Sequence, residues 1–278
     1  MYKILFKEDL APSIHLLKVE APAVARKAQP GQFVVVRVDE KGERIPLTIA
    51  DWDSGEGSIT IVFNEVGRTT HKLAMLRVGD FITNFVGPLG LPAHIERFGT
   101  VVCVATGYGI ATIVPVVRAL REEGNRLISI IWAQSKGFLL GEDRLRSLSE
   151  RLIVTTGDGS YGREGFVLEP LEELLQGDEK VDRVIVVGST CTMRLCAATT
   201  RPFGVKTIVS LNPIMVDGTG MCGVCRVSIG GETKFACVDG PEFDGHEVDW
   251  ALLMARRCTY SGEQSSVLQY QCHHCAQW

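Results

Sequence analysis

The sequence has no long apolar run, although 45% of its 278 residues are hydrophobic. No stretch reaches the roughly 18 apolar residues that a membrane-spanning helix needs. The first nine residues, MYKILFKED, contain no apolar core of the kind that a secretory signal carries. We therefore expect a cytoplasmic protein that does not insert into a membrane.

A basic surface and a hydrolytic motif are also missing. The net charge is −4, and no basic run or aromatic-basic platform suggests a nucleic-acid partner. No Ser-His-Asp set, pair of carboxylates or metallohydrolase motif can be identified, so hydrolytic chemistry is not indicated. The composition is that of an ordinary globular protein, without low-complexity linkers or internal repeats, and the length suggests two or three domains.

The first region, residues 1–97, is punctuated by turn residues at roughly regular intervals. Between these turns we predict short strands at Lys3–Phe6, Ile14–Val19, Gln32–Val38, Pro46–Ala50, Ser58–Phe63 and Asp80–Phe85. Short strands at such a spacing are typical of a small antiparallel barrel.

Residues 98–209 show a different rhythm, in which apolar strands alternate with helices. We predict strands at Val101–Ala105, Leu127–Ala133, Leu152–Thr156 and Arg183–Val187, and helices at Ile110–Glu123, Asp143–Glu150, Leu168–Gln176 and Cys191–Thr200. Apolar strands between helices indicate a parallel sheet covered on both faces, as in a Rossmann-like α/β unit. The glycine- and cysteine-rich remainder, residues 210–278, is predicted to form a third unit.

The third region contains the densest chemical motif, Asp217-Gly-Thr-Gly-Met-Cys222-Gly-Val-Cys225, followed by Cys237. With cysteine in place of Asp217, the spacing would be that of the plant-type ligands of a [2Fe–2S] cluster. The intervening glycines allow the backbone to wrap closely around an inorganic core. Three thiolates and one carboxylate can supply four anionic ligands, so the motif predicts a cluster held by Asp217, Cys222, Cys225 and Cys237.

Other interpretations of these residues stay open at the level of sequence. Cys222 and Cys225 could form half of a zinc site completed by Cys272-His-His-Cys275, although Cys237 would then be unexplained. Asp217 could be an ordinary turn residue. Disulfides are not favoured, because nine cysteines is an odd number and cytosolic thiols are expected to stay reduced. Neither Cys258 nor the C-terminal Cys272 and Cys275 receives an assigned role.

Two runs in the first region suit phosphate groups. In Arg44-Ile-Pro-Leu-Thr48, a guanidinium at a strand offers forked donors to a pyrophosphate. Gly67-Arg-Thr69-Thr70 precedes a short helix, whose free backbone N–H groups can bind an anion. Thr69 or Thr70 can equally cap this helix with its own hydroxyl.

The second region contains a glycine turn between its first strand and first helix, Thr106-Gly107-Tyr-Gly109-Ile-Ala111. These glycines allow a dinucleotide to approach the helix N-terminus closely. Further candidates follow later strands, at Gly157-Asp158 and Gly188, because ligands bind at the carboxyl ends of strands in open α/β sheets.

The order of these parts resembles that of the ferredoxin-reductase-like flavoproteins. Within this group the chain resembles the branch that contains the electron-transfer subunit of dihydroorotate dehydrogenase. It is also similar to the NAD-binding small subunit of NADH-dependent reduced ferredoxin:NADP oxidoreductase, also known as sulfide dehydrogenase. The resemblance covers nearly the whole chain. It implies an FAD-binding β-barrel at 1–97, an NAD(H)-binding α/β domain at 98–209 and a small [2Fe–2S] domain at 210–278.

The resemblance also implies roles for individual residues. It places Arg44 near the FAD phosphates and Thr48 near the isoalloxazine, while Leu47 departs from the aromatic residue common in the superfamily. The implied FAD-binding residues are Arg44, Pro46, Leu47, Thr48, Gly67, Thr69 and Thr70. The implied NAD(H)-binding residues are Thr106, Gly107, Gly109, Ala111, Gly157, Asp158 and Gly188. Cys191 could help to position the nicotinamide, or it could be a small apolar filler like Cys103 and Cys196.

The implied function is electron transfer from NADH through FAD to the cluster and on to a partner. Ser135 and Lys136 could read an NADP phosphate, but the resemblance favours NAD(H). The first candidate partner is the larger flavo-iron–sulfur subunit of a ferredoxin:NADP transhydrogenase, which uses ferredoxin and includes electron-bifurcating forms. The alternative partner is the catalytic subunit of dihydroorotate dehydrogenase, but that branch has cysteine at the position of Asp217. A remaining alternative is a zinc-stabilised nucleotide-binding subunit without redox activity.

Overall fold

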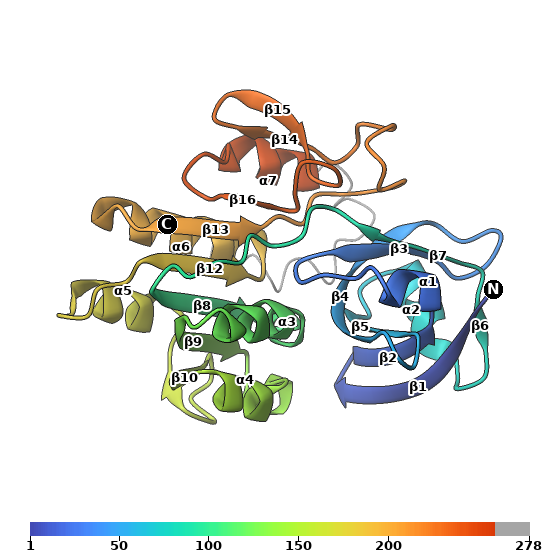
Figure 1. Cartoon of the computed structure of the whole chain (residues 1–278), viewed down its shortest axis with the longest axis horizontal. Helices are drawn as coiled ribbons and strands as arrows, with labels where there is room; N and C mark the ends of the chain where they lie inside the picture. The colour runs from blue at the N-terminus through green and yellow to red at the C-terminus, as the bar shows by residue number, and fades with distance from the viewer. Residues whose placement is uncertain (259–278) are drawn as a thin grey trace.

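The computed structural model describes residues 1–258, so the Cys272–Cys275 segment lies outside the described residues. Figure 1 shows a strand-rich N-terminal unit beside a central sheet flanked by helices, with a smaller C-terminal unit packed above both. The C-terminal unit contacts both the N-terminal unit and the central sheet.

The N-terminal unit is an antiparallel barrel-like sheet with the order β6-β1-β2-β5-β4-β3-β7. Its core consists of apolar side chains that alternate along the strands, such as Leu17 and Val19, together with Phe63 and Phe85. The strands are β1 (Tyr2–Ala11), β2 (Ile14–Glu20), β3 (Phe33–Arg37), β4 (Ile45–Asp53), β5 (Ser58–Asn64), β6 (Phe81–Ile82) and β7 (Asn84–Leu89). Two short helices, α1 (Pro22–Ala25) and α2 (Arg68–Met75), accompany them.

The central sheet has the order β11-β10-β9-β8-β12-β13-β16, and all of its neighbouring strands are parallel except β16. Helices cover both faces, which explains why β8 is buried almost throughout. The strands are β8 (Thr100–Thr106), β9 (Arg126–Ala133), β10 (Arg151–Thr156), β11 (Arg163–Glu164), β12 (Arg183–Val187) and β13 (Lys206–Ser210). The helices are α3 (Gly109–Glu122), η1 (Lys136–Phe138), α4 (Glu142–Leu148), α5 (Leu168–Gln176), α6 (Thr190–Thr200) and η2 (Arg201–Phe203). The predicted α/β architecture is confirmed.

The C-terminal unit contains the hairpin of β14 (Arg226–Ile229) and β15 (Glu232–Phe235), strand β16 (Glu242–Asp244) and helix α7 (Trp250–Cys258). It is tied to both other units. Strand β16 extends the central sheet by pairing with β13. Phe33 and Val35 of the barrel share one apolar cluster with Cys225 and Cys237.

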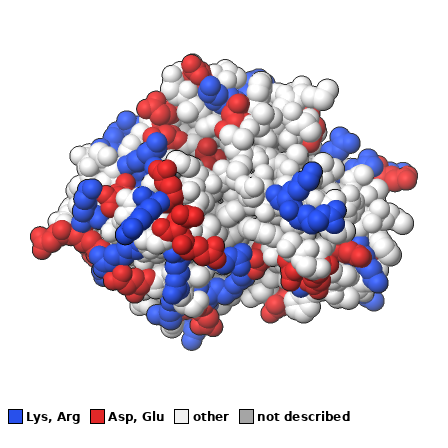
Figure 2. Space-filling model, viewed as in Figure 1, with Lys and Arg blue, Asp and Glu red and all other residues white. Residues whose placement is uncertain are grey.

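On the face drawn in Figure 2, Lys and Arg side chains lie among Asp and Glu side chains over the α/β unit. The described part of this face has no extended surface of a single charge sign. Within the α/β unit, Arg126 forms an ion pair with Glu150. Among the helices described in residues 1–258, none is long and apolar enough to cross a membrane.

Candidate cofactor sites

The loop at 217–225 is organised by Asp217. Its Oδ1 accepts a hydrogen bond from the backbone N–H of Thr219 at 2.9 Å, and its Oδ2 accepts one from that of Cys222 at 3.0 Å. These bonds lower the pKa of the Asp217 carboxyl, the Thr219 bond most of all. The structure thus gives Asp217 a turn-forming role. Since each carboxylate oxygen keeps a second lone pair, ligation by Asp217 stays a prediction.

Two of the predicted cluster ligands already converge. The Sγ atoms of Cys225 and Cys237 are 3.2 Å apart and buried, whereas Cys222 is exposed. Two thiolates on one tetrahedral metal would be about 3.7 Å apart, given metal–sulfur bonds of about 2.3 Å. In the side-chain positions of residues 1–258, no three His, Cys, Asp or Glu groups yet form a metal site. The donor set fits a cluster if Cys222 turns inward from the loop.

Glycine is required in this loop for two physical reasons. Gly218 and Gly220 have φ values of +77° and +85°, which side chains rarely adopt. A Cβ at Gly218 would also lie 2.8 Å from Leu89 and Val35 of the barrel. The loop is therefore pressed against β3 and β7.

The run predicted to bind FAD lies on the same side of the barrel as this loop. Thr48 on β4 is directly opposite Phe33 on β3, and Pro46 is opposite Val35. Because directly opposed residues point to one face of a sheet, Thr48 and Pro46 face the side on which the cluster loop packs. Leu47 packs against the barrel core instead, so its placement does not favour the predicted cofactor contact. Arg44 is exposed just before β4.

The second predicted FAD run lies next to the first in space. The hydroxyl of Thr69 donates to Glu43 Oε2 at 3.0 Å, which ties the start of α2 to the residue before Arg44. The hydroxyl of Thr70 accepts from the backbone N–H groups of Val66 and Gly67, both at 3.0 Å. Thr70, at the third position of α2, thus bonds back to the N-cap residue Gly67, in line with the capping that the sequence allowed. A phosphate at this end of α2 would use the remaining backbone N–H groups.

The glycine turn after β8 brings the sheet and α3 very close together. A Cβ on Gly109 would lie 2.8 Å from the carbonyl oxygen of Val187, so only glycine fits there. Gly107 has a φ of +58° and open space around it. Ala111 lies in the first turn of α3, partly buried against the sheet. The turn leaves the N-terminus of α3 accessible, as dinucleotide binding requires.

The ends of the neighbouring strands meet at this turn. A Cβ on Gly188 would lie 2.2 Å from Thr106 Oγ1, so β8 and the β12–α6 loop touch. Thr106 Oγ1 is 3.3 Å from Thr192 Oγ1, and Ser189 caps α6 by accepting from the backbone N–H of Thr192 at 3.1 Å. The structure therefore brings Thr106, Gly107, Gly109 and Gly188 together at one edge of the sheet.

The loop after β10 completes this edge. Asp158 accepts hydrogen bonds from both the hydroxyl and the backbone N–H of Ser160, which lower the pKa of Asp158. Gly157 packs beside Trp132, whose ring would lie 3.4 Å from a Cβ at that glycine. Trp132 Nε1 is buried and has no hydrogen-bond acceptor among the described residues. Such an unpaired buried donor fits a site that a polar ligand completes.

The remaining cysteines follow two patterns. Cys103 and Cys196 are buried in the α/β unit, and burial raises the pKa of each thiol to about 12. They are the apolar fillers that the sequence allowed. Cys191, in the first turn of α6, is disulfide-bonded, so the expectation that every thiol is reduced is wrong at this position. A role for Cys191 in placing a nicotinamide gains no support from this bonding.

Two arginines of α7 connect the sites, and sequence reasoning missed both. Arg256 donates to the carbonyl oxygen of Val224, between the predicted ligands of the cluster loop, at 3.0 Å. Arg257 donates to the hydroxyl of Thr190 and, at 3.2 Å, to Asn212 Oδ1. Neighbouring residues of one helix thus hold the cluster loop and the first residue of α6.

Known proteins show the same combination of parts. Residues 212–249 match the model of the iron–sulfur cluster binding domain of dihydroorotate dehydrogenase B. The electron transfer subunit homologue of dihydroorotate dehydrogenase B from Thermotoga maritima is 46% identical, over 94% of this chain and 92% of its own. The corresponding electron transfer subunit from Shouchella clausii is 31% identical, over 88% of this chain and 96% of its own.

Solved structures are also similar to this chain. A chain from the structure of NADH-dependent reduced ferredoxin–NADP oxidoreductase, described in the context of flavin-based electron bifurcation, superposes with a TM-score of 0.90 at 45% identity. The match covers 98% of this chain and 97% of that one. The ferredoxin NADP+ reductase from Neisseria gonorrhoeae has a TM-score of 0.62 at 20% identity, covering 73% and 90%, which shows a shared fold.

Proposed function

The chain belongs to the family of dihydroorotate dehydrogenase B electron transfer subunits, and we propose that it passes electrons between NAD(H), FAD and a [2Fe–2S] cluster. A bound FAD would accept two electrons as a hydride and release them singly, which matches a cluster that accepts one. The chain itself would bind FAD and the cluster and hold them at a short distance from each other.

The observation that carries this proposal is the shared face of the barrel. Thr48 lies opposite Phe33, and Phe33 packs in the same apolar cluster as Cys225 and Cys237. A flavin held at Thr48 and a cluster held at these cysteines would therefore lie on the same side of one sheet. A site built only for nucleotide binding would not need this proximity.

We assign the binding roles as follows. Arg44, with the N-terminus of α2 at Gly67 and Thr69, would hold the FAD phosphates, while Pro46 and Thr48 would line the flavin. The cluster would be held by Asp217, Cys222, Cys225 and Cys237. Nicotinamide dinucleotide would lie along the edge formed by Thr106, Gly107, Gly109, Ala111, Gly157, Asp158 and Gly188.

The partner that we propose is a larger flavo-iron–sulfur subunit of a ferredoxin:NADP transhydrogenase, with ferredoxin as an indirect partner. The similarity to a chain of NADH-dependent reduced ferredoxin–NADP oxidoreductase, at 45% identity over nearly the whole length, supports this choice. A catalytic subunit of dihydroorotate dehydrogenase is the second candidate, supported by the names of the sequence relatives. We place the protein in the cytoplasm, where pools of NADH and ferredoxin are available.

The composition of the anaerobically purified chain tests the proposal. We expect one FAD, two irons and two acid-labile sulfides per chain, with flavin and cluster bands in the visible spectrum. A colourless protein with one zinc and no flavin would contradict it and favour a structural metal. Co-purification with a large subunit that oxidises dihydroorotate would favour the second partner.

A further inference from the structure

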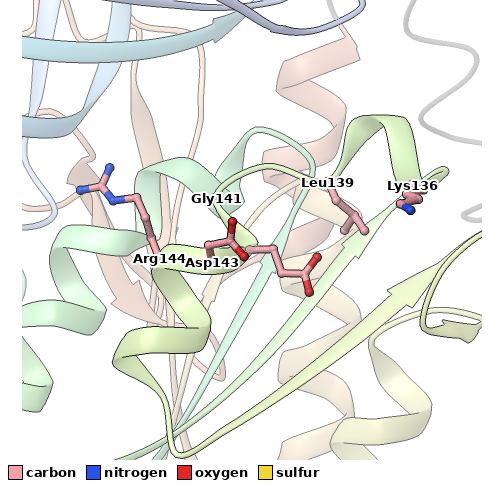
Figure 3. A pocket seen from close by; sticks show the side chains of 6 residues that line it. Lys136, Leu139, Gly141, Asp143 and Arg144 are labelled. Carbon is pink, nitrogen blue, oxygen red and sulfur yellow. The ribbon is translucent and has the colours of Figure 1, made fainter.

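Asp51 joins the barrel to the α/β unit through two arginines on different helices. It lies on β4, three residues beyond Thr48. Its Oδ1 accepts from Arg118 Nη2 of α3 at 2.8 Å, and its Oδ2 accepts from Arg144 Nη2 of α4 at 2.5 Å. Arg144 also lines a hollow together with Lys136 and Leu139, and Figure 3 shows its guanidinium at the side of this hollow opposite Lys136.

The surroundings make this contact stronger than an ordinary surface ion pair. The Asp51 side chain is only 24% exposed, compared with 36% for Arg118 and 50% for Arg144. Burial on its own would raise the pKa of Asp51, but hydrogen bonds from both arginines outweigh it and lower the pKa. The Arg118 guanidinium also lies over the ring of Trp52, 5.7 Å from its centre, which restricts its orientation.

The two ends of this link lie on elements that carry the proposed flavin site and the proposed dinucleotide site. Strand β4 carries Thr48, the residue proposed to contact the flavin, and α3 begins at Gly109, in the proposed dinucleotide turn. A shift between β4 and α3 would therefore change the distance between nicotinamide and flavin. Hydride transfer depends steeply on that distance.

We propose that Asp51 is a positioning residue, which fixes the α/β unit against the barrel through Arg118 and Arg144 so that the nicotinamide reaches the flavin. This inference rests on the proposed function. It assigns to Asp51 no contact with either cofactor. Its effect is on alignment, so its loss should slow hydride transfer far more than it weakens cofactor binding.

The test is Asp51→Asn in the full chain, which keeps the size of the side chain and removes its charge. We expect NADH to reduce the flavin about tenfold more slowly in anaerobic stopped-flow measurements, while the FAD content and the Kd for NADH change less than about twofold. Arg144→Gln, at the more exposed end, should slow reduction in the same direction by a smaller factor. Amide hydrogen exchange should become faster in both β4 and α3 of Asp51→Asn.

Glu150→Gln is the matched control. Glu150 forms a similar paired contact with Arg126, at 2.7 and 2.9 Å, but both residues belong to the α/β unit. The control should leave flavin reduction and the exchange of β4 unchanged. Equal slowing in Asp51→Asn and Glu150→Gln, or unchanged reduction and exchange in Asp51→Asn, would overturn the proposal. A wild-type chain whose flavin NADH does not reduce would instead contradict the proposed function, while the exchange comparison would still report on the link.

Discussion

The carboxylate of Asp217 accepts two backbone hydrogen bonds within the cluster loop and is also the predicted fourth ligand. Asp217→Cys separates these roles. If Asp217 binds iron, the variant should keep a [2Fe–2S] cluster but shift its reduction potential and its EPR g-values, because thiolate is a softer ligand than carboxylate. Potentiometry and EPR of the reduced variant measure both. Spectra identical to those of the wild type would remove Asp217 from the ligand set and leave it the turn-forming role.

Glu242 on β16 has a raised pKa, which should make the stability of the fold depend on pH. Burial raises the pKa of its carboxyl to about 7 from 4.5, although Arg183 opposes this shift. Between these values the folded chain holds a proton that the unfolded chain has released, so stability falls as the pH rises from about 4.5 to about 7.

Glu242→Gln should remove this dependence, because the amide stays neutral. We expect the variant to be more stable than the wild type by about 1–3 kcal/mol at pH 8 and similar to it near pH 4.5. Urea unfolding at both values measures the difference, and Glu247→Gln, an exposed change in the same unit, is the control. A constant difference across this range would mean that Glu242 is ionised in the folded chain.

Gly188 tests the contact between strand ends at the proposed dinucleotide site. In Gly188→Ala the new Cβ would meet Thr106 Oγ1 at 2.2 Å, so the loop or the strand must move. We expect a loss of about 1–3 kcal/mol of stability and weaker NADH binding. Gly137→Ala, which has no atom within 4 Å of the new Cβ, should change neither. Equal NADH affinity in both variants, measured by calorimetry, would argue against a dinucleotide at this edge.

At the scale of elements, α7 links the cluster loop to the start of α6 through adjacent arginines. Arg256→Ala removes the bond to Val224 in the cluster loop and should speed the loss of iron on exposure to a chelator. Arg257→Ala removes the bonds to Thr190 and Asn212 and should instead weaken NADH binding severalfold. Iron release and calorimetric titration measure the two effects. Identical behaviour of the variants would show that α7 acts only as general support.

Some helices and strands could be predicted from the sequence because the pattern that defines them lies within the element and its flanking residues. Helix α5 and strand β12 match the predicted ranges, since a regular apolar pattern and flanking polar turns define both. Strands β13 and β16 were not predicted. Glu242–Asp244 has no strand-like pattern of its own, and its pairing with β13 depends on a chain reversal of more than thirty residues. Long-range pairing of this kind is set by tertiary packing.

The residues of the candidate sites also fall into two groups, those that lie in a sequence motif and those that do not. Glycine requirements at Gly109 and Gly218 follow motifs that are visible in the sequence, and the structure supplies the close contacts that explain them. Asp51 and the arginines of α7 belong to no motif. Their importance depends on which distant residues they meet, so the sequence alone could not single them out.

At the scale of the whole molecule, the barrel, the α/β unit and the C-terminal unit are all in contact with one another. The cluster loop packs on the barrel, α7 contacts the first residue of α6, and Asp51 links β4 to α3 and α4. Each unit therefore constrains the placement of the other two. Such an arrangement suits transfer between cofactors at short distance better than independent binding modules would.

The most direct test of this account follows electrons from NADH to the cluster within the isolated chain. In an anaerobic titration monitored by visible absorption and EPR, NADH should bleach the flavin and produce a one-electron [2Fe–2S] signal. A sample stripped of flavin should show no cluster reduction by NADH while still responding to dithionite. A cluster that dithionite reduces but NADH does not, in the presence of reduced flavin, would contradict the account.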